Sequence, residues 1–208
     1  MTFIMAMQAE DSLIVSADNT TVAFSNRKAF RQNIAAKKLH SWPGGVFTGT
    51  GEYGVVQRTL GHLIRGAALS SLPACLAHEK AYRRQEAGPN EQIDITRLIL
   101  SAPTPEGPRL HIVTDDAIEQ IGPGELLMFF PLDYDFFAAS SEAIRDLNAA
   151  LRPQSAFATP DEWIGFYAEK FARIYALQSQ NNQLISRSFN IHFQTEEQSL
   201  MFFAENSA

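Results

Sequence analysis

The spacing of apolar residues changes in blocks along this chain, and this alternation constrains the fold more than any other feature of the sequence. A block of strand-length apolar runs comes first and is followed by two stretches with apolar residues at helical spacing. The same alternation then repeats before a final pair of strands closes the chain. The expected strands are 2–8, 12–17, 20–24, 38–42, 46–49, 93–101, 109–113, 126–130, 186–194 and 198–204. The expected helices are 53–68, 72–86, 135–152 and 160–178.

Turn and cap residues support several of these boundaries. Pro43-Gly44-Gly45 predicts a tight turn between two strands. Thr159-Pro160-Asp161-Glu162 predicts the start of a helix, because threonine caps well, proline suits the first helical position, and glutamate follows three residues after the cap. Residues 26–37 contain several basic side chains and are expected to form a long polar connection.

Strand blocks that alternate with helix pairs predict an α+β fold. A doubly wound parallel sheet would instead show single strands alternating with single helices. Two antiparallel sheets packed face to face, with a helix pair on each outer face, would bury every apolar surface, so we expect a four-layer αββα sandwich. The chain has 208 residues, 45% of them hydrophobic, which suffices for one well-packed core. We therefore expect a single domain over residues 1–208.

Charge and residue usage exclude several classes of partner. The net charge of -6 argues against nucleic acid and anionic membranes, which call for clustered Lys and Arg. The sequence lacks a signal-like start and any apolar run of about 18 residues, so we expect a cytoplasmic protein without a membrane partner. A single cysteine, Cys75, excludes a disulfide framework, and the five histidines show no ligand spacing. We expect no metal and no cofactor.

Thr2 stands directly behind the initiator methionine, at the start of the first expected strand. Removal of Met1 would leave Thr2 with a free α-amine and a hydroxyl on one residue, which is a nucleophile next to a candidate base. An α-amine has a pKa of about 7.7–8.0, so a useful fraction is neutral near physiological pH and can accept the hydroxyl proton. Thr2 is therefore a candidate catalytic nucleophile.

Three further motifs occur at suggestive places after Thr2. Ala17-Asp18 ends the second expected strand, Lys38-Leu39 opens a later one, and Phe47-Thr48-Gly49-Thr50-Gly51 stands where a strand meets the first long helix. With the order of elements, these motifs resemble the proteasome β-subunit and HslV-like family of N-terminal-nucleophile hydrolases. The resemblance in element order covers nearly the whole chain and implies the αββα fold of that family, a homo-oligomeric ring and a threonine-type active site.

The chemistry of an acyl-transfer site fits the same residue types. Thr2 would attack an amide carbonyl, while the charge of Lys38 lowers the cost of forming the alkoxide. Asp18 would keep that ammonium oriented and charged. A backbone N–H in the Gly49 segment would donate to the oxyanion, with glycine leaving the approach of the substrate unobstructed.

The choice between two adjacent lysines stays open at this point. Successive strand residues face opposite sides, so only one of Lys37 and Lys38 can point inward. Lys38 is preferred because an aliphatic residue follows it. Free strand edges near the nucleophile could hold an extended peptide as an added strand. The expected substrate-binding residues are Thr20, Thr21, Val22, Thr48 and Thr50.

The leading hypothesis is a proteasome-like threonine peptidase or amide hydrolase that acts on peptides or proteins inside a homo-oligomeric ring, with an unfolding ATPase partner left open. Two departures from the family pattern favour an alternative. A Gly-Ser-Gly-like element is missing from residues 130–135, and Ser186 and Ser188 do not clearly match the family's Asp and Ser pair. The second hypothesis is therefore a catalytically weak or inactive ring subunit that serves as a scaffold or binding chamber. A third is a small-molecule amidase with the same nucleophile.

Overall fold

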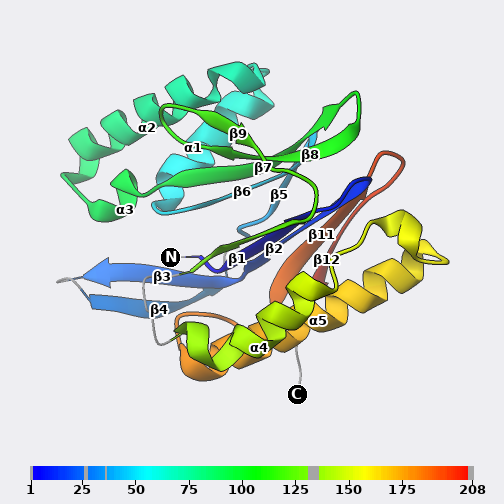
Figure 1. Ribbon diagram of the computed structural model, residues 1–208. Helices are drawn as coiled ribbons and strands as arrows, with labels where there is room; N and C mark the ends of the chain where they lie inside the picture. Colours follow the sequence, from blue (N-terminus) through cyan, green and yellow to red (C-terminus); the bar gives the residue numbers. More distant parts are fainter. Residues whose placement is uncertain (1, 26–27, 36, 131–135, 206–208) are drawn as a thin grey trace.

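A computed structural model describes residues 2–25, 28–35, 37–130 and 136–205 (Figure 1). The strands are β1 (Ile4–Gln8), β2 (Ser12–Asp18), β3 (Thr20–Ser25), β4 (Lys28–Ala35), β5 (His40–Trp42), β6 (Gly45–Thr50), β7 (Arg97–Thr104), β8 (Gly107–Val113), β9 (Ile118–Gln120), β10 (Glu125–Phe129), β11 (Phe189–Thr195) and β12 (Ser199–Ala204). The α-helices are α1 (Tyr53–Ile64), α2 (Leu72–Ala87), α3 (Glu91–Asp94), α4 (Phe136–Ala149) and α5 (Pro160–Asn181).

Two five-stranded antiparallel sheets form the centre of the molecule. One has the order β10-β1-β2-β11-β12 and the other the order β5-β6-β7-β8-β9. Helices α1 and α2 cover the outer face of the second sheet, while α4 and α5 cover the outer face of the first (Figure 1). This is the α+β, four-layer arrangement that the sequence predicts. Strands β3 and β4 form a separate two-stranded ribbon.

Three apolar clusters fill the spaces between the layers. The cluster between the sheets contains Ile4, Ala6, Leu13, Val15, Ala17, Leu39, Val46, Ile99, Leu110 and Ile121. Between the first sheet and its helices lie, among others, Phe3, Met5, Met7, Trp163, Tyr167, Phe171, Tyr175 and Phe189. Between the second sheet and its helices lie, among others, Phe47, Val55, Val56, Leu60, Leu72 and Leu98. Both sheets are therefore apolar on both faces.

The burial of strand β1 explains why the start of the chain is apolar without alternation. Phe3, Met5 and Met7 point to the helix side of the sheet, while Ile4 and Ala6 point to the other sheet. Side chains alternate between the two faces of a strand, so a strand covered on both faces is a continuous apolar run. The residues behind Thr2 are thus fixed in the centre of the core.

Several local expectations are confirmed and others are wrong. Thr159 caps α5, its hydroxyl accepting the Glu162 N–H at 3.2 Å, and Trp42 pairs with Gly45 across the expected turn. The 26–37 segment is wrong as a connection, because Lys28–Ala35 forms β4 against β3; residues 26, 27 and 36 lie outside the described ranges. Ladder pairing uses backbone groups, so a polar segment can join a strand without an apolar pattern.

The strand expected over 93–101 starts later, at Arg97. A short helix precedes it, with the Asn90 side chain accepting the Gln92 N–H at 2.9 Å. Strand β9 was not expected, because three residues are too few to show a period. Within the described ranges no helix is both long enough and apolar enough to span a membrane.

Candidate active site

The carboxylate of Asp18 is the centre of a fully buried polar cluster at the end of β2. Its Oδ1 atom accepts hydrogen bonds from Lys38 Nζ at 2.7 Å and from the Phe3 N–H at 2.9 Å. Its Oδ2 atom accepts one from the Thr20 N–H at 3.0 Å. A buried carboxylate is tolerated only when it is paired and hydrogen-bonded, and these three donors meet that requirement.

The structure brings Lys38, rather than Lys37, to this carboxylate. Lys38 is 7% exposed, whereas Lys37 lies at the surface. The Thr48 hydroxyl donates to the Lys38 carbonyl at 2.8 Å and so ties this lysine to β6. Burial lowers the pKa of the Lys38 amine, while the charge and hydrogen bond of Asp18 act in the opposite direction. The Lys38 ammonium therefore loses its proton more easily in the folded protein than in water.

Thr2 lies next to this ion pair. It is half-buried and directly precedes Phe3, whose N–H shares the Asp18 Oδ1 acceptor with Lys38 Nζ. The lysine ammonium thus lies within two hydrogen-bond lengths of the amide nitrogen bonded to the Thr2 carbonyl carbon. The fold brings Thr2, Asp18 and Lys38 together from three separate parts of the chain. Met1, whose removal the sequence hypothesis requires, lies outside the described residues.

Tyr175 of α5 supports the first residues from the helix side of the sheet. Its ring stacks on Phe189 with centroids 4.2 Å apart and meets Phe3 edge-on at 4.9 Å. Its hydroxyl donates to Ser16 Oγ at 3.1 Å. Complete burial raises the pKa of the Tyr175 phenol well above its ordinary value, so this group stays protonated. The start of β1 is therefore held by Tyr175 from the helix side of the sheet and by the hydrogen bond from the Phe3 N–H to Asp18.

The structure gives a different reason for glycine at position 49. A Cβ there would lie 2.8 Å from the Arg97 carbonyl oxygen and 2.9 Å from Val56 Cγ2. That direction points toward α1 and away from the other sheet. The expectation that glycine leaves space for a substrate is thus wrong, because the missing Cβ allows β6, β7 and α1 to pack closely.

The backbone N–H of Gly49 points in a different direction from the one that a Cβ would take. The Val46 N–H of β6 donates to Ser101 Oγ of β7 at 2.8 Å. Because N–H groups alternate between the two edges of an antiparallel strand, the N–H of Gly49 points to the opposite edge, toward β5. The β5 ladder begins at the His40–Phe47 pair, so Gly49 lies beyond its end.

The expected substrate-binding residues divide into two groups. In the first, the hydroxyl oxygens of Thr20 and Thr21 are buried without a hydrogen-bond partner among the described residues. One edge of this segment is not free as expected, because Thr21 and Val22 pair with β4. In the second group, the Thr48 hydroxyl is already bound to Lys38, and Thr50 is half-buried at the end of β6, where it pairs with Arg97.

The structure connects Ser186 and Ser188, for which the sequence analysis finds no clear match to the family pair, to the Asp18 segment. The Asn19 N–H donates to Ser186 Oγ at 2.8 Å, and Ser186 in turn donates to the Ser188 carbonyl at 2.7 Å. Asn190 Nδ2 donates to Asn19 Oδ1 at 2.5 Å. The antiparallel register of β11 and β2 places Phe189 opposite Asp18, and this brings the segment after α5 to the site. A separation of 167 residues carries no local signal that could have revealed this contact.

Among the described side chains no group of three or more His, Cys, Asp or Glu residues is arranged to hold a metal ion. Cys75 is half-buried in α2 and forms no disulfide.

The architecture and the position of this cluster define a class of fold: an α+β, four-layer sandwich of two antiparallel sheets, related to the fold of N-terminal-nucleophile hydrolases. No family model matches the sequence, and no curated protein matches it.

Solved structures of Anbu proteins share the fold. The Gly-1 mutant of Anbu from Hyphomicrobium sp. strain MC1 superposes with a TM-score of 0.66 at 14% identity, over 100% of this chain and 89% of that one. Anbu from Yersinia bercovieri, described as an ancestral beta-subunit, gives 0.64 at 13% identity, over 99% and 88%. A helical assembly of the Anbu complex from Pseudomonas aeruginosa gives 0.70 at 13% identity, over 99% and 88%. At such identities the likeness shows the fold alone.

The resemblance to proteasome β-subunits and HslV is therefore corrected. The matching structures named above are Anbu proteins, and no sequence family matches. The order of strand blocks and helix pairs follows from the sandwich architecture itself, so it cannot distinguish between families that share this architecture. The remaining sequence marks were three short motifs, too few to decide between such families.

Proposed function

We propose that the protein is a threonine-type peptidase or amide hydrolase in which Thr2, after removal of Met1, is the nucleophile. The observation that carries this proposal is the buried Lys38–Asp18 ion pair, which shares a carboxylate oxygen with the N–H of Phe3. The Asp18 carboxylate accepts hydrogen bonds from both the Phe3 N–H and Lys38 Nζ and so fixes Lys38 relative to the residue that follows Thr2.

The reaction begins when the α-amine of mature Thr2 takes the proton of the Thr2 hydroxyl. The oxygen attacks the amide carbonyl of the substrate, and the tetrahedral intermediate collapses to an ester as the amine product leaves with that proton. Water then attacks the ester carbonyl and loses a proton to the same amine. The amine returns this proton to Thr2 Oγ as the ester C–O bond breaks, which releases the carboxylic acid and restores the Thr2 hydroxyl. The Lys38 ammonium lowers the energy of the alkoxide throughout, and Asp18 keeps the ammonium in place.

Gly49 supplies the oxyanion contact in this proposal. Its N–H points to the edge of β6 that extends beyond the β5 ladder, which is the geometry that a backbone donor requires. Loss of a single oxyanion donor typically costs about 10²–10³ in kcat.

The substrate in this proposal is an extended peptide. It would run along the edge of β6 at Thr48–Thr50 and along the edge of β3 that β4 leaves open, with main-chain hydrogen bonds to both. The segment 20–22 would contribute backbone groups rather than hydroxyls, because the hydroxyl oxygens of Thr20 and Thr21 are buried. A small-molecule amidase would not depend on these edges, so comparing turnover of peptides and simple acyl amides separates the two substrate classes.

The decisive experiment combines intact mass with a peptide epoxyketone, a reagent that joins both the amine and the hydroxyl of an N-terminal threonine. We expect the purified protein to lack Met1 and to gain the mass of one inhibitor per chain. Thr2→Ala is the matched control, because alanine also permits methionine removal but lacks the hydroxyl. A chain that keeps Met1, or an adduct that persists in Thr2→Ala, would contradict the proposal. A chain without Met1 that forms neither adduct nor product would favour the inactive-subunit alternative.

We further propose that the protein assembles into a homo-oligomer. An Anbu complex with this fold forms a helical assembly, which supports self-association but leaves the symmetry open. A closed ring has one mass at all concentrations, whereas an open helix grows with concentration. Light scattering across a hundredfold concentration range therefore distinguishes a ring, a helix and a monomer.

A further inference from the structure

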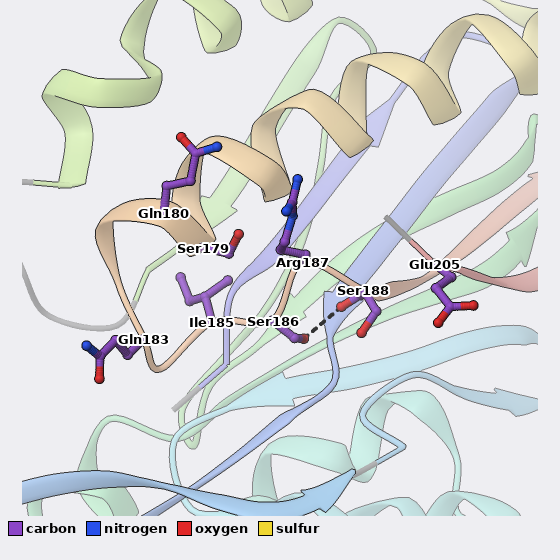
Figure 2. Close-up of a pocket in the computed structure, with 8 residues that line it drawn as sticks. All are labelled: Ser179, Gln180, Gln183, Ile185, Ser186, Arg187, Ser188 and Glu205. Carbon is purple, nitrogen blue, oxygen red and sulfur yellow. Dashed lines mark hydrogen bonds between the residues drawn. The ribbon is translucent and has the colours of Figure 1, made fainter. Parts of the chain in front are cut away.

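A pocket lined mostly by polar residues lies at the end of α5. Its volume is about 710 Å³, within the range of small-ligand sites. The lining comes from the last turn of α5, from the segment that leads into β11, and from Glu205 after β12 (Figure 2). No step of the proposed hydrolysis uses these residues.

The pocket is joined to the active site through Ser186. This serine lines the pocket, and its Oγ atom accepts the N–H of Asn19, the residue after Asp18. Ser186 is 6% exposed, so this connection is part of the packed structure rather than a surface contact. A ligand in the pocket would therefore lie next to the segment that carries the Asp18 carboxylate.

Arg187 is the cation of this pocket. In the view of Figure 2 it stands between Ser179 and Gln180 on one side and Ser188 and Glu205 on the other. Its Nε atom is buried and lacks a hydrogen-bond partner among the described residues. None of the ion pairs among those residues includes Arg187, not even with Glu205, the acidic residue of the lining.

A guanidinium without a counter-charge gains a charge-assisted hydrogen bond from a ligand that supplies a negatively charged acceptor. A carboxylate is the matching acceptor, because its two oxygens fit the planar fork of a guanidinium. The Ser188 hydroxyl and the Gln183 side-chain amide also line the pocket and add donors. The lining thus offers a carboxylate one cationic anchor and several neutral donors, with one like charge at Glu205.

We infer that this pocket binds the C-terminal carboxylate of a peptide substrate, with Arg187 as the anchor. The inference rests on the proposed function, because it takes the ligand to be the substrate of the Thr2 site. It narrows the substrate class to peptides whose free C-terminus lies near the bond that is cleaved. Internal segments of long chains lack that carboxylate and would bind less tightly.

The test measures binding, and the Thr2→Ala variant keeps the peptides uncut. The probes are two fluorescent peptides of one sequence, one with a free C-terminal acid and the other with a C-terminal amide, followed by anisotropy. We expect the acid to bind at least about tenfold more tightly, as for one charge-assisted hydrogen bond. Free acetate tests whether any small carboxylate fills the pocket; it should compete only weakly, because it lacks the peptide's strand contacts.

Three variants added to Thr2→Ala assign the effect to residues. Arg187→Gln should bind the acid and the amide equally, while Arg187→Lys should keep part of the preference because it keeps the charge. Glu205→Gln should raise the affinity for the acid a few-fold, since it removes a like charge, and leave the amide unchanged. Thermal melts of each variant confirm folding.

Equal binding of acid and amide by the folded parent, or a preference that survives in Arg187→Gln, would overturn the inference. Competition by acetate as strong as by the peptide acid would also overturn it, because the pocket would then be a general anion site. The result of the epoxyketone experiment does not depend on Arg187, because that reagent reacts with the amine and the hydroxyl of Thr2. A failure of the proposed function can therefore be told apart from a failure of this inference.

Discussion

Lys38 and Asp18, twenty residues apart in the sequence, form a buried ion pair with 2.7 Å between Nζ and Oδ1. The pair joins the strand that follows Thr2 to the segment that leads into the second sheet, because Asp18 also accepts the Phe3 N–H and Lys38 is tied to Thr48. A buried pair of this kind costs desolvation and adds little net stability. We therefore expect removal of both charges to cost less stability than removal of one.

Asp18→Asn is expected to destabilise the protein by about 3 kcal/mol, because it leaves the Lys38 amine buried without its counter-charge. Urea unfolding measures the loss. The matched control is Asp18→Asn with Lys38→Met, which removes both charges and keeps an apolar side chain of similar length. We expect the double variant to recover much of the stability but none of the amide hydrolysis. Full activity in the double variant would show that the pair is only structural.

Gly49→Ala is expected to destabilise the protein by about 1–3 kcal/mol, the usual cost of overpacking. The new methyl group would meet the Arg97 carbonyl at 2.8 Å and Val56 Cγ2 at 2.9 Å. Thermal unfolding measures the loss. Val56→Ala in the same chain should restore only part of it, because the carbonyl cannot move aside as a side chain can. A Gly49→Ala protein as stable as the parent would contradict the packing explanation.

His192 predicts a pH dependence of stability. It is 1% exposed, and burial lowers its pKa from 6.5 to about 4. Between these values the unfolded chain binds more protons than the folded chain, so the stabilising contribution is complete above pH 6.5 and is lost as the pH falls toward 4.

The His192 contribution should fall by about 2 kcal/mol between pH 7 and pH 5. Urea unfolding of the parent and of His192→Gln at both pH values isolates this change. Glutamine does not titrate, and the contributions of the other titratable groups to the free energy of unfolding cancel when the two proteins are compared. An equal pH dependence in the two proteins would show that His192 is not the titrating group.

Thr159→Ala is expected to cost about 1 kcal/mol, because it leaves the Glu162 N–H at the start of α5 without its acceptor. Thr159→Ser is the matched control and should retain most of the stability, since it keeps the hydroxyl. Thermal unfolding of the three proteins checks the order. A loss of equal size in both variants would point to the threonine methyl group instead of the cap.

The sequence alone determined the alternation of strand blocks with helix pairs, the layered α+β class and the cap of α5, but it missed the short elements α3 and β9 and the strand β4. These features depend on residues two to four positions apart, whose spacing is visible in the chain. It also singled out Asp18 and Lys38 as candidates, but it left Lys37 open and gave the wrong reason for Gly49.

Only the tertiary structure decided which side chains meet. The pairing of β11 with β2 brings Ser186 to Asn19, and burial places Lys38, not Lys37, at Asp18. These contacts join residues 20 to 167 positions apart. Such contacts depend on how complete sheets pack and on which backbone groups are left to pair, and no local period records that information.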